Sequence, residues 1–388
     1  MKKILIIHYG EIALKGKNRI FFENKLIKNI KLVLRGFEIE EVNRLRGRIV
    51  IGLKESVANE AIVECLKKVF GIAHFSIGVQ IGTDLQQMKE VSLQLMQELS
   101  FDSFRVSTRR AQKEFPMTSV EINREVGAYI YEHCQKKVDL KHADATCYIE
   151  ITEKGTLIYT EKVPGLRGMP SGVSEKAVSL LSSGIDSPVA SYMMIKRGVK
   201  LIFAHFHSEP YTSRASQENT EKLVDILNDY QYYSKVYFVP FIDIQKEIMA
   251  KAPSELRVLL YRCYMVRLSE RIANLEGAVA LVTGENVAQV ASQTLSNIRV
   301  VAEATTLPIL RPLAGFDKEE IIQVAQRIGT YETSIQPYED CCTLFVPQNP
   351  ATKAKPEDLA EAEKLLDMDG LMDDAMRRAE IKVFSQKA

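Results

Sequence analysis

The residues best suited to chemistry lie between Leu180 and Ala190, where the sequence reads LLSSGIDSPVA. A strand-like apolar run leads directly into small and hydroxyl-bearing residues, and a helix-like stretch follows. Small residues at such a turn let backbone N–H groups approach a ligand, and the start of a helix adds free donors and a partial positive charge. The pattern predicts an anion-binding turn. A Ser/Asp helix cap after a core strand is the plainer interpretation.

Two other nucleotide-binding patterns are excluded. The chain contains no G-x-x-x-x-G-K-[ST] sequence, and residues 172–176 (GVSEK) resemble one only superficially. No G-x-G-x-x-G follows a strand-like run, so a nicotinamide cofactor has no support. His205 and His207 have no third ligand near them in the sequence, so we expect no metal ion held by protein side chains alone.

A carboxylate and a pair of thiols are the remaining candidates. Asp186 either caps the helix that follows it or ligates Mg²⁺ on the phosphates of a nucleotide. Cys341 and Cys342 precede a proline-punctuated stretch, so we expect them on a loop, where a thiolate can act as a nucleophile and carry a persulfide. The other four cysteines fall in apolar helix or strand patterns and are expected to be inert core residues: Cys65, Cys134, Cys147 and Cys263.

The elements that must position these residues change character near residue 163. Before it, strand-like and helix-like runs alternate as in a split βαβ, ferredoxin-like unit followed by further α/β units. Strands are expected at 3–9, 37–42, 48–53, 72–81, 103–109, 145–152 and 156–161, and helices at 18–34, 58–69, 85–99 and 119–134.

The second half has a different pattern. Short apolar runs at 178–181, 200–206, 235–239, 278–283 and 307–310 alternate mostly with helix-like stretches, which predicts a doubly wound parallel sheet with helices on both faces. The last 35 residues are acidic and helical in pattern. A stretch rich in glycine and proline separates the two halves. We therefore expect domains at 1–57, 58–162 and 176–388, with a linker at 163–175.

The sequence LLSSGIDSPVA closely resembles the PP-loop, SGGxDS, of ATP pyrophosphatases, which adenylate a substrate and release pyrophosphate. Further stretches match in order: YGEIALKGKNR at 9–19, FGI at 70–72, GENVAQVASQT at 284–294, RPL at 311–313 and YEDCC at 338–342. Together they resemble the tRNA 4-thiouridine synthetases, the tRNA sulfurtransferases of the ThiI family. Only 46 residues follow Cys342, too few for the C-terminal rhodanese domain of some members. The resemblance implies an N-terminal ferredoxin-like domain, an RNA-binding THUMP domain and a PP-loop ATP pyrophosphatase domain.

The resemblance also implies site residues. It places ATP contacts at Leu180, Leu181, Ser182, Gly184, Ser187, His205, Phe206, Arg262, Gly284 and Gln293, and catalytic roles at Asp186 and Cys341. Ser183 stands where the PP-loop normally has its first glycine, which costs free energy only if the backbone there needs a positive φ. Without the resemblance, Arg262 would be interpreted as a surface ion pair and Gly284 as a turn residue.

Charge separates the two halves of the chain. Residues 1–170 carry 27 Lys and Arg against 21 Asp and Glu, whereas residues 171–388 carry 24 against 29, so the net charge is only +1. A basic half favours a polyanionic partner. Each basic cluster alone is more typical of a solvated face, but the THUMP resemblance at 103–127 favours RNA. The clusters are Lys15, Lys17 and Arg19; Arg44, Arg46 and Arg48; and Arg105, Arg109, Arg110 and Lys113.

The resemblance implies a function. With ATP and Mg²⁺, the protein would adenylate a uridine at position 8 of tRNA and form 4-thiouridine, using a persulfide on Cys341 loaded by a cysteine desulfurase. It also implies sulfur transfer to a thiamine sulfur-carrier protein as a C-terminal thiocarboxylate. The alternatives are a tRNA-binding protein that binds ATP without turnover, and an amide-forming ligase, for which no glutaminase segment is present.

Apolar runs and an amphipathic stretch give expectations for the cellular location and the oligomeric state of the protein. No window approaches 18 consecutive apolar residues, so no membrane span is expected. The short apolar run after Lys2 and Lys3 lacks the features of a signal peptide, which favours the cytoplasm. The amphipathic C-terminal stretch favours a homodimer.

Overall fold

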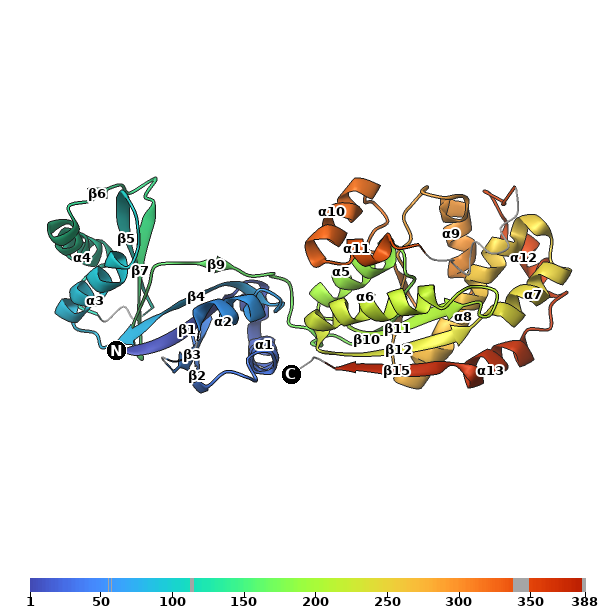
Figure 1. Ribbon diagram of the computed structural model, residues 1–388, viewed down its shortest axis with the longest axis horizontal. Coiled ribbons are helices and arrows are strands. Elements are labelled where there is room, and N and C mark those ends of the chain that lie inside the picture. The colour runs from blue at the N-terminus through green and yellow to red at the C-terminus, as the bar shows by residue number, and fades with distance from the viewer. Residues whose placement is uncertain (55, 57, 112–114, 338–348, 386–388) are drawn as a thin grey trace. The chain divides into compact units, whose positions relative to one another are not determined.

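The computed structural model describes residues 1–54, 56, 58–111, 115–337 and 349–385. Contacts between residues divide the chain into two compact units, Met1–Met169 and Pro170–Ala388 (Figure 1). No helix among these described residues is both long and apolar enough to cross a bilayer.

The first unit is built on one nine-stranded sheet. Its strands are β1 (Lys2–Tyr9), β2 (Ile39–Leu45), β3 (Arg48–Leu53), β4 (Ile72–Ile81), β5 (Ser103–Arg110), β6 (Lys137–Val138), β7 (Ala145–Thr152), β8 (Gly155–Tyr159) and β9 (Val163–Pro164). The main order is β2-β3-β1-β4-β8-β7-β5-β6. β4 lies between the two parts of the sheet, because it pairs antiparallel with β1 and with β8. β9, within the stretch expected as a linker, pairs with β4.

Four α-helices accompany this sheet: α1 (Arg19–Val33), α2 (Asn59–Leu66), α3 (Leu85–Gln97) and α4 (Ser119–Cys134). α4 begins with a capping box, in which the Thr118 side chain accepts from the backbone of Glu121 and the Glu121 side chain accepts from the backbone of Thr118. α3 and α4 pack against the part of the sheet that contains β5 and β7. The expected order of strands and helices in this half is confirmed, with ends that differ by a few residues.

A buried polar cluster ties β1, β3, β7 and β8 together. Arg48 is only 4% exposed and forms an ion pair with Glu150, which also accepts a hydrogen bond from the Tyr159 hydroxyl at 2.7 Å. His8 Nε2 lies 3.2 Å from the same carboxylate, and burial lowers the pKa of His8 to about 3. The prediction that Arg48 belongs to a surface cluster is therefore wrong, because its guanidinium is used inside the unit.

The second unit contains a six-stranded sheet in the order β14-β13-β10-β11-β12-β15. β10 (Lys176–Leu180), β11 (Lys200–His207), β12 (Tyr233–Pro240), β13 (Ala280–Val282) and β14 (Ile309–Leu310) are parallel. The helices are α5 (Asp186–Lys196), α6 (Ala215–Gln231), α7 (Ile242–Lys251), α8 (Arg257–Glu276), α9 (Leu295–Ala302), α10 (Lys318–Ile328), α11 (Tyr331–Ser334), α12 (Pro356–Glu363) and α13 (Asp369–Arg378).

Helices cover both faces of this sheet. Val178 of β10 packs in the core that contains α8, whereas the adjacent Ser179 hydrogen-bonds Ser191 of α5 at 2.9 Å. Because successive strand residues point to opposite faces, α5 and α8 lie on opposite sides. The predicted doubly wound α/β architecture is confirmed for this unit.

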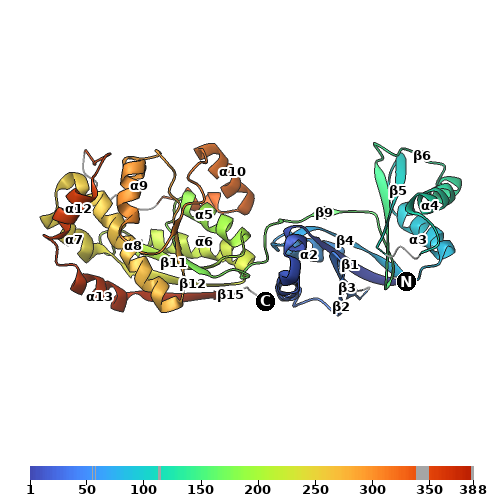
Figure 2. The same cartoon turned by 180° about the vertical axis from the view of Figure 1, so that it is seen from behind.

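The last part of the chain differs from the prediction. β15 (Glu380–Ser385) pairs antiparallel with β12 and forms the outer edge of the sheet, as both views show (Figure 1, Figure 2). The sequence EIKV at its start alternates polar and apolar residues, but a strand of six residues is too short to outweigh the helical pattern of α12 and α13 before it. Pairing with β12 selects the strand.

Replacing Arg48 with Ala should strongly destabilise the first unit. The substitution leaves the Glu150 carboxylate buried without its cationic partner, a loss of about 3–5 kcal/mol. Calorimetry should show an unfolding transition at lower temperature. Arg46→Ala, at an exposed position two residues away, is the matched control and should change the transition little. Equally small effects of both substitutions would contradict a stabilising role for the buried cluster.

Candidate nucleotide-binding site

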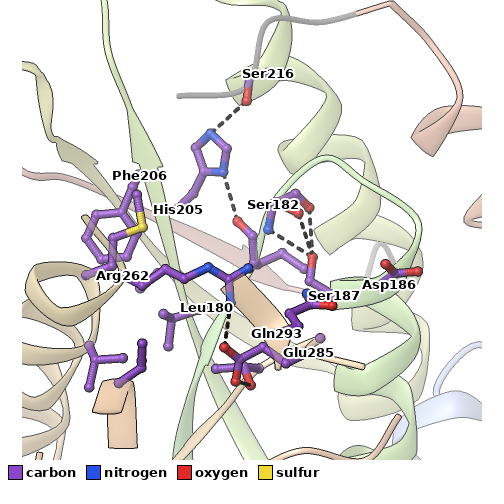
Figure 3. Close-up of a pocket in the computed structure, with 17 residues that line it drawn as sticks. Leu180, Ser182, Asp186, Ser187, His205, Phe206, Ser216, Arg262, Glu285 and Gln293 are labelled. Atoms are coloured by element: carbon purple, nitrogen blue, oxygen red, sulfur yellow. Dashed lines mark hydrogen bonds and ion pairs between the residues drawn. The ribbon is translucent and has the colours of Figure 1, made fainter. Parts of the chain in front are cut away.

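A pocket of about 240 Å³ lies at the carboxyl edge of the parallel sheet in the second unit (Figure 3). Its walls come from the segments that follow β10 and β13, the end of β11, and α8. Ligands of open α/β sheets bind at this edge. The structure brings together nine of the ten expected ATP contacts as lining residues, and Asp186 with them; Gly184 lies in the same turn but is not a lining residue.

Serine side chains hold the turn between β10 and α5 in shape. The Ser182 backbone N–H donates to Ser187 Oγ at 2.9 Å, and Ser187 Oγ donates to the Ser182 carbonyl at 3.1 Å. The Gly184 N–H donates to Ser182 Oγ at 3.3 Å. α5 starts directly after this turn, and the residue before it, Ile185, makes no side-chain cap. The first N–H groups of α5 therefore have no capping side chain in front of them, as an anion site requires.

Ser183 fits the turn without backbone strain. Its φ does not fall in the left-handed region that favours glycine. The side chain is fully buried, with Oγ 3.4 Å from Ser216 Oγ. The departure from the usual glycine therefore has no steric cost at this position.

Gly284 is required by the close approach of two segments. A Cβ atom at this position would lie 2.8 Å from the Ser187 backbone nitrogen and 2.9 Å from Ser187 Cα. These atoms belong to the first turn of α5 and cannot move independently of it. Gly284 also lines the pocket, and the space that a Cβ would need is filled by the start of α5.

The opposite wall is apolar and contains one fixed imidazole. His205 lies 2.9 Å from the Leu181 carbonyl through Nδ1 and 3.1 Å from Ser216 Oγ through Nε2 (Figure 3). The Phe206 ring packs edge-on against Phe241 with centroids 5.6 Å apart. Apolar side chains complete this wall: Leu180, Met265, Val266 and Val301. Such a surface suits the flat face of a nucleobase.

Charged side chains occupy the rest of the pocket. Arg262 Nη1 lies 2.6 Å from one carboxylate oxygen of Glu285, and Arg311 Nε lies 2.6 Å from the other. Arg262 therefore forms an ion pair, but inside the pocket rather than on the surface. The buried amide oxygen of Gln293 has no hydrogen-bond partner among the described residues, so it can accept from a ligand.

Asp186 is paired at the start of α5. Its carboxylate lies 2.5 Å from Lys318 Nζ and accepts from Gln289 Nε2 at 3.3 Å. Sequence reasoning missed Lys318, which is 132 residues away and carries no local signal. It also missed Glu285, although its position directly after Gly284 at the end of a strand was a usable signal.

Cys341 and Cys342 lie outside the described residues. Of the other cysteines, Cys147 and Cys263 are buried, and burial raises the pKa of their thiols to about 11 and about 12. Cys65 is half-buried with a raised pKa, and Cys134 is half-buried. Thiols with raised pKa values form little thiolate at neutral pH, which fits the inert roles expected for Cys147 and Cys263.

These features define a class of protein. The second unit is a PP-loop α/β domain with a pocket at the carboxyl edge of its sheet, and it follows a ferredoxin-like domain and a THUMP domain in the same chain. Family models match all three: the ThiI ferredoxin-like domain at residues 4–76, the THUMP domain at 82–161 and "Thiamine biosynthesis protein (ThiI)" at 172–368.

Relatives and solved structures agree with this class. The chain is 45% identical over 374 residues to a probable tRNA sulfurtransferase of Caldanaerobacter subterraneus, covering 96% of this chain and 98% of the relative. It is 43% identical to a probable tRNA sulfurtransferase of Brevibacillus brevis, covering 99% and 97%. A crystal structure of a 4-thiouridine synthetase–RNA complex with bound ATP superposes with a TM-score of 0.91 at 38% identity, covering 99% and 100%. The chain therefore belongs to the ThiI family of tRNA sulfurtransferases, which are transferases, and the resemblance expected from its motifs is confirmed.

Replacing Gly284 with Ala should weaken nucleotide binding at least tenfold, because the added Cβ must displace the first turn of α5. Gly315→Ala is the matched control: it lies in the same unit, and a Cβ there meets nothing within 4 Å. Isothermal titration with ATP measures both. Equal ATP affinity for the two variants would contradict the argument from close approach.

Proposed function

We propose that this protein is an ATP-dependent tRNA sulfurtransferase that forms 4-thiouridine at position 8 of tRNA. The observation that carries the proposal is the pocket, where an uncapped start of α5, the Arg262 guanidinium and an apolar wall face the same space, with Lys318 paired to the lining residue Asp186. ATP needs each of these: donors and cations for its phosphates, and an apolar surface for its base. The solved relative with bound ATP and RNA supports the same assignment.

In this proposal the phosphates lie at the start of α5, within reach of Arg262 and Lys318. The Asp186 carboxylate fits a Mg²⁺ ion, because this ion commonly takes one or two carboxylates and completes its shell with phosphate oxygens and water. Mg²⁺ would neutralise charge on the leaving pyrophosphate. Lys318 would then move from Asp186 to the phosphates, since a cation on the metal's ligand opposes metal binding.

The reaction proceeds in three steps. O4 of the uridine attacks the α-phosphorus of ATP, and pyrophosphate leaves, so that the oxygen at C4 becomes part of a good leaving group. The terminal sulfur of a persulfide on Cys341 attacks C4, and AMP leaves. Attack by a second thiol on Cys341 then releases the sulfur on the base as 4-thiouridine. A cysteine desulfurase is the proposed source of the persulfide.

Anchors on both sides of residues 338–348 support the role of Cys341. Before this segment, the Ser334 hydroxyl donates to the Gly184 carbonyl at 3.3 Å. After it, the Asn297 side chain donates to the Ala351 carbonyl at 2.8 Å and accepts from the Ala354 N–H at 3.1 Å. Asn297 belongs to α9, which begins two residues after Gln293. The described residues on either side of 338–348 are thus attached to the turn before α5 and to α9, both of which border the pocket.

The first unit is the proposed tRNA-binding part. Exposed cations remain on its surface after the correction for Arg48: Lys17, Arg44, Arg46 and Arg109. Arg105 and Arg110 are half-buried and donate to protein carbonyls. Lys113 lies outside the described residues. Exposed arginines bind phosphates without sequence preference, which suits recognition of a folded RNA by shape.

The same adenylation chemistry also suits a C-terminal carboxylate of a thiamine sulfur-carrier protein. The description of the matching family as a thiamine biosynthesis protein supports this second substrate. The alternative of ATP binding without turnover rested on Ser183, and the unstrained φ of Ser183 removes that reason.

Cys341→Ser should abolish 4-thiouridine formation but leave tRNA-dependent pyrophosphate release, because a serine hydroxyl cannot carry a persulfide. Cys342→Ser is the matched control and should retain at least part of the activity. Nucleoside analysis of tRNA after incubation with ATP, cysteine and a desulfurase gives the product. Full activity of both variants would show that no persulfide on this loop is needed. Loss of activity in Cys342→Ser with full activity in Cys341→Ser would assign the nucleophile to Cys342.

Arg46→Gln should weaken tRNA binding and lower the slope of log affinity against log salt concentration by about one, because each phosphate contact contributes about 0.9 to this slope on a duplex. Arg377→Gln, at an exposed position in the second unit, is the control. Fluorescence titration of tRNA at several salt concentrations measures both slopes. Equal slopes for Arg46→Gln and the unsubstituted protein would show that Arg46 lies in a solvated surface.

A further inference from the structure

Glu285 holds a position in the pocket that the proposed chemistry leaves unexplained. Its side chain is 6% exposed and lies between two arginines that come from different elements. Arg262 reaches it from α8 and Arg311 from the residue after β14, each at 2.6 Å (Figure 3 shows the Arg262 contact). The Thr283 hydroxyl adds a hydrogen bond at 3.0 Å. Three segments of the second unit therefore converge on one carboxylate.

A carboxylate next to a site for a polyanion needs a physical reason. Taken alone, the Glu285 charge repels phosphate oxygens and opposes ATP binding. Its two ion pairs reverse this conclusion, because two guanidinium groups share one carboxylate and leave a net positive charge. Each guanidinium has five N–H donors, and Glu285 takes only one nitrogen of each.

The unused donors make Arg262 available to a ligand, whereas Arg311 lies behind the Glu285 carboxylate and does not line the pocket. Arg262 lines the pocket, and only Nη1 of its guanidinium is engaged with Glu285. Arg311 uses Nε for Glu285 and Nη1 for the Ile309 carbonyl at 3.4 Å, whereas its buried Nη2 has no partner among the described residues. A buried guanidinium nitrogen without a partner is costly unless a ligand satisfies it.

We propose that Glu285 is a positioning residue that, braced by Arg311 on its other carboxylate oxygen, holds the Arg262 guanidinium in the orientation that binds the phosphates of ATP. This inference rests on the proposed function of the pocket. An arginine side chain loses rotamer freedom when it binds a phosphate, and fixing it beforehand removes that cost from the binding step. Glu285 acts on the nucleotide only through Arg262, and Arg311 fixes the carboxylate from its other side.

The test compares ATP with adenosine, which lacks phosphates. Glu285→Gln should lower ATP affinity about tenfold and change adenosine affinity less than twofold, both measured by isothermal titration with the full chain. The amide keeps the size of the side chain but removes the anion that two guanidinium groups share, so thermal unfolding is recorded for each variant and affinities are compared well below the unfolding transition. Glu285→Asp, which keeps the charge, should bind ATP more tightly than Glu285→Gln. Glu363→Gln is the control. Glu363 pairs with Arg267, which lies on α8 as Arg262 does, and Glu363 does not line the pocket.

A double substitution tests whether Glu285 acts through Arg262. With Arg262→Met already present, Glu285→Gln should have a much smaller further effect on ATP affinity. Equal losses of ATP and adenosine affinity in Glu285→Gln would assign Glu285 to the ribose or to folding, and unchanged ATP affinity or strict additivity would also overturn the proposal. Failure of the proposed function would be seen in a different measurement. The unsubstituted protein would then form no 4-thiouridine in tRNA, whatever the affinities of the variants for ATP and adenosine.

Discussion

The site depends on how closely the start of α5 approaches the end of β13. β10 and β13 are neighbours in the sheet, with Ser179 opposite Val282, so the segments that follow them begin side by side. Only a glycine at position 284 lets the first turn of α5 settle against its neighbour, since a Cβ would meet Ser187 at 2.8 Å. This contact sets the floor of the pocket and the direction of the α5 N–H groups. The other wall residues can act on a ligand together because the start of α5 is held in a fixed place.

The charged groups at the pocket are paired before any ligand binds. Arg262 and Arg311 share Glu285, and Lys318 pairs with Asp186, which leaves one more cation than carboxylates. The two pairings differ in burial: Glu285 lies under both arginines, whereas the Lys318 side chain is 45% exposed and can exchange its partner. In the proposed reaction the buried pairing keeps its geometry while the exposed pairing opens. In this proposal the Glu285 pairing orients the nucleotide, whereas the Asp186–Lys318 pairing opens when the nucleotide and Mg²⁺ bind.

The sequence allowed most of the fold to be predicted, for physical reasons that differ between elements. The alternating short apolar runs of the second half identified the parallel sheet, because strands buried on both faces need such runs. β15 was missed because its strand form depends on pairing with β12, a contact remote in the sequence. Arg48 was misplaced because an arginine next to exposed arginines gives no sign that Glu150, about a hundred residues later, lies across the sheet from it.

The pocket residues also divide into those with a local signal in the sequence and those without one. The turn at 180–187 has a local signal, since small residues between a strand and a helix are needed for the turn itself. Arg262, Gly284 and Gln293 were expected from the family resemblance and lie around one pocket. Lys318 and Arg311 became visible as partners of Asp186 and Glu285 only through the fold, because ion pairs between distant segments leave no pattern in the sequence. The role of Cys341 stays a prediction from its motif and from the anchors on either side.

The central claim is that ATP activates O4 of the uridine, and an oxygen label tests it most directly. A tRNA that carries ¹⁸O at O4 of uridine 8 is incubated with the protein, ATP, cysteine and a desulfurase, and the products are analysed by mass spectrometry. Because the base oxygen attacks the α-phosphorus and leaves with it, the account predicts one ¹⁸O in AMP for each 4-thiouridine formed, and none in pyrophosphate. Formation of 4-thiouridine with unlabelled AMP would contradict adenylation of the base.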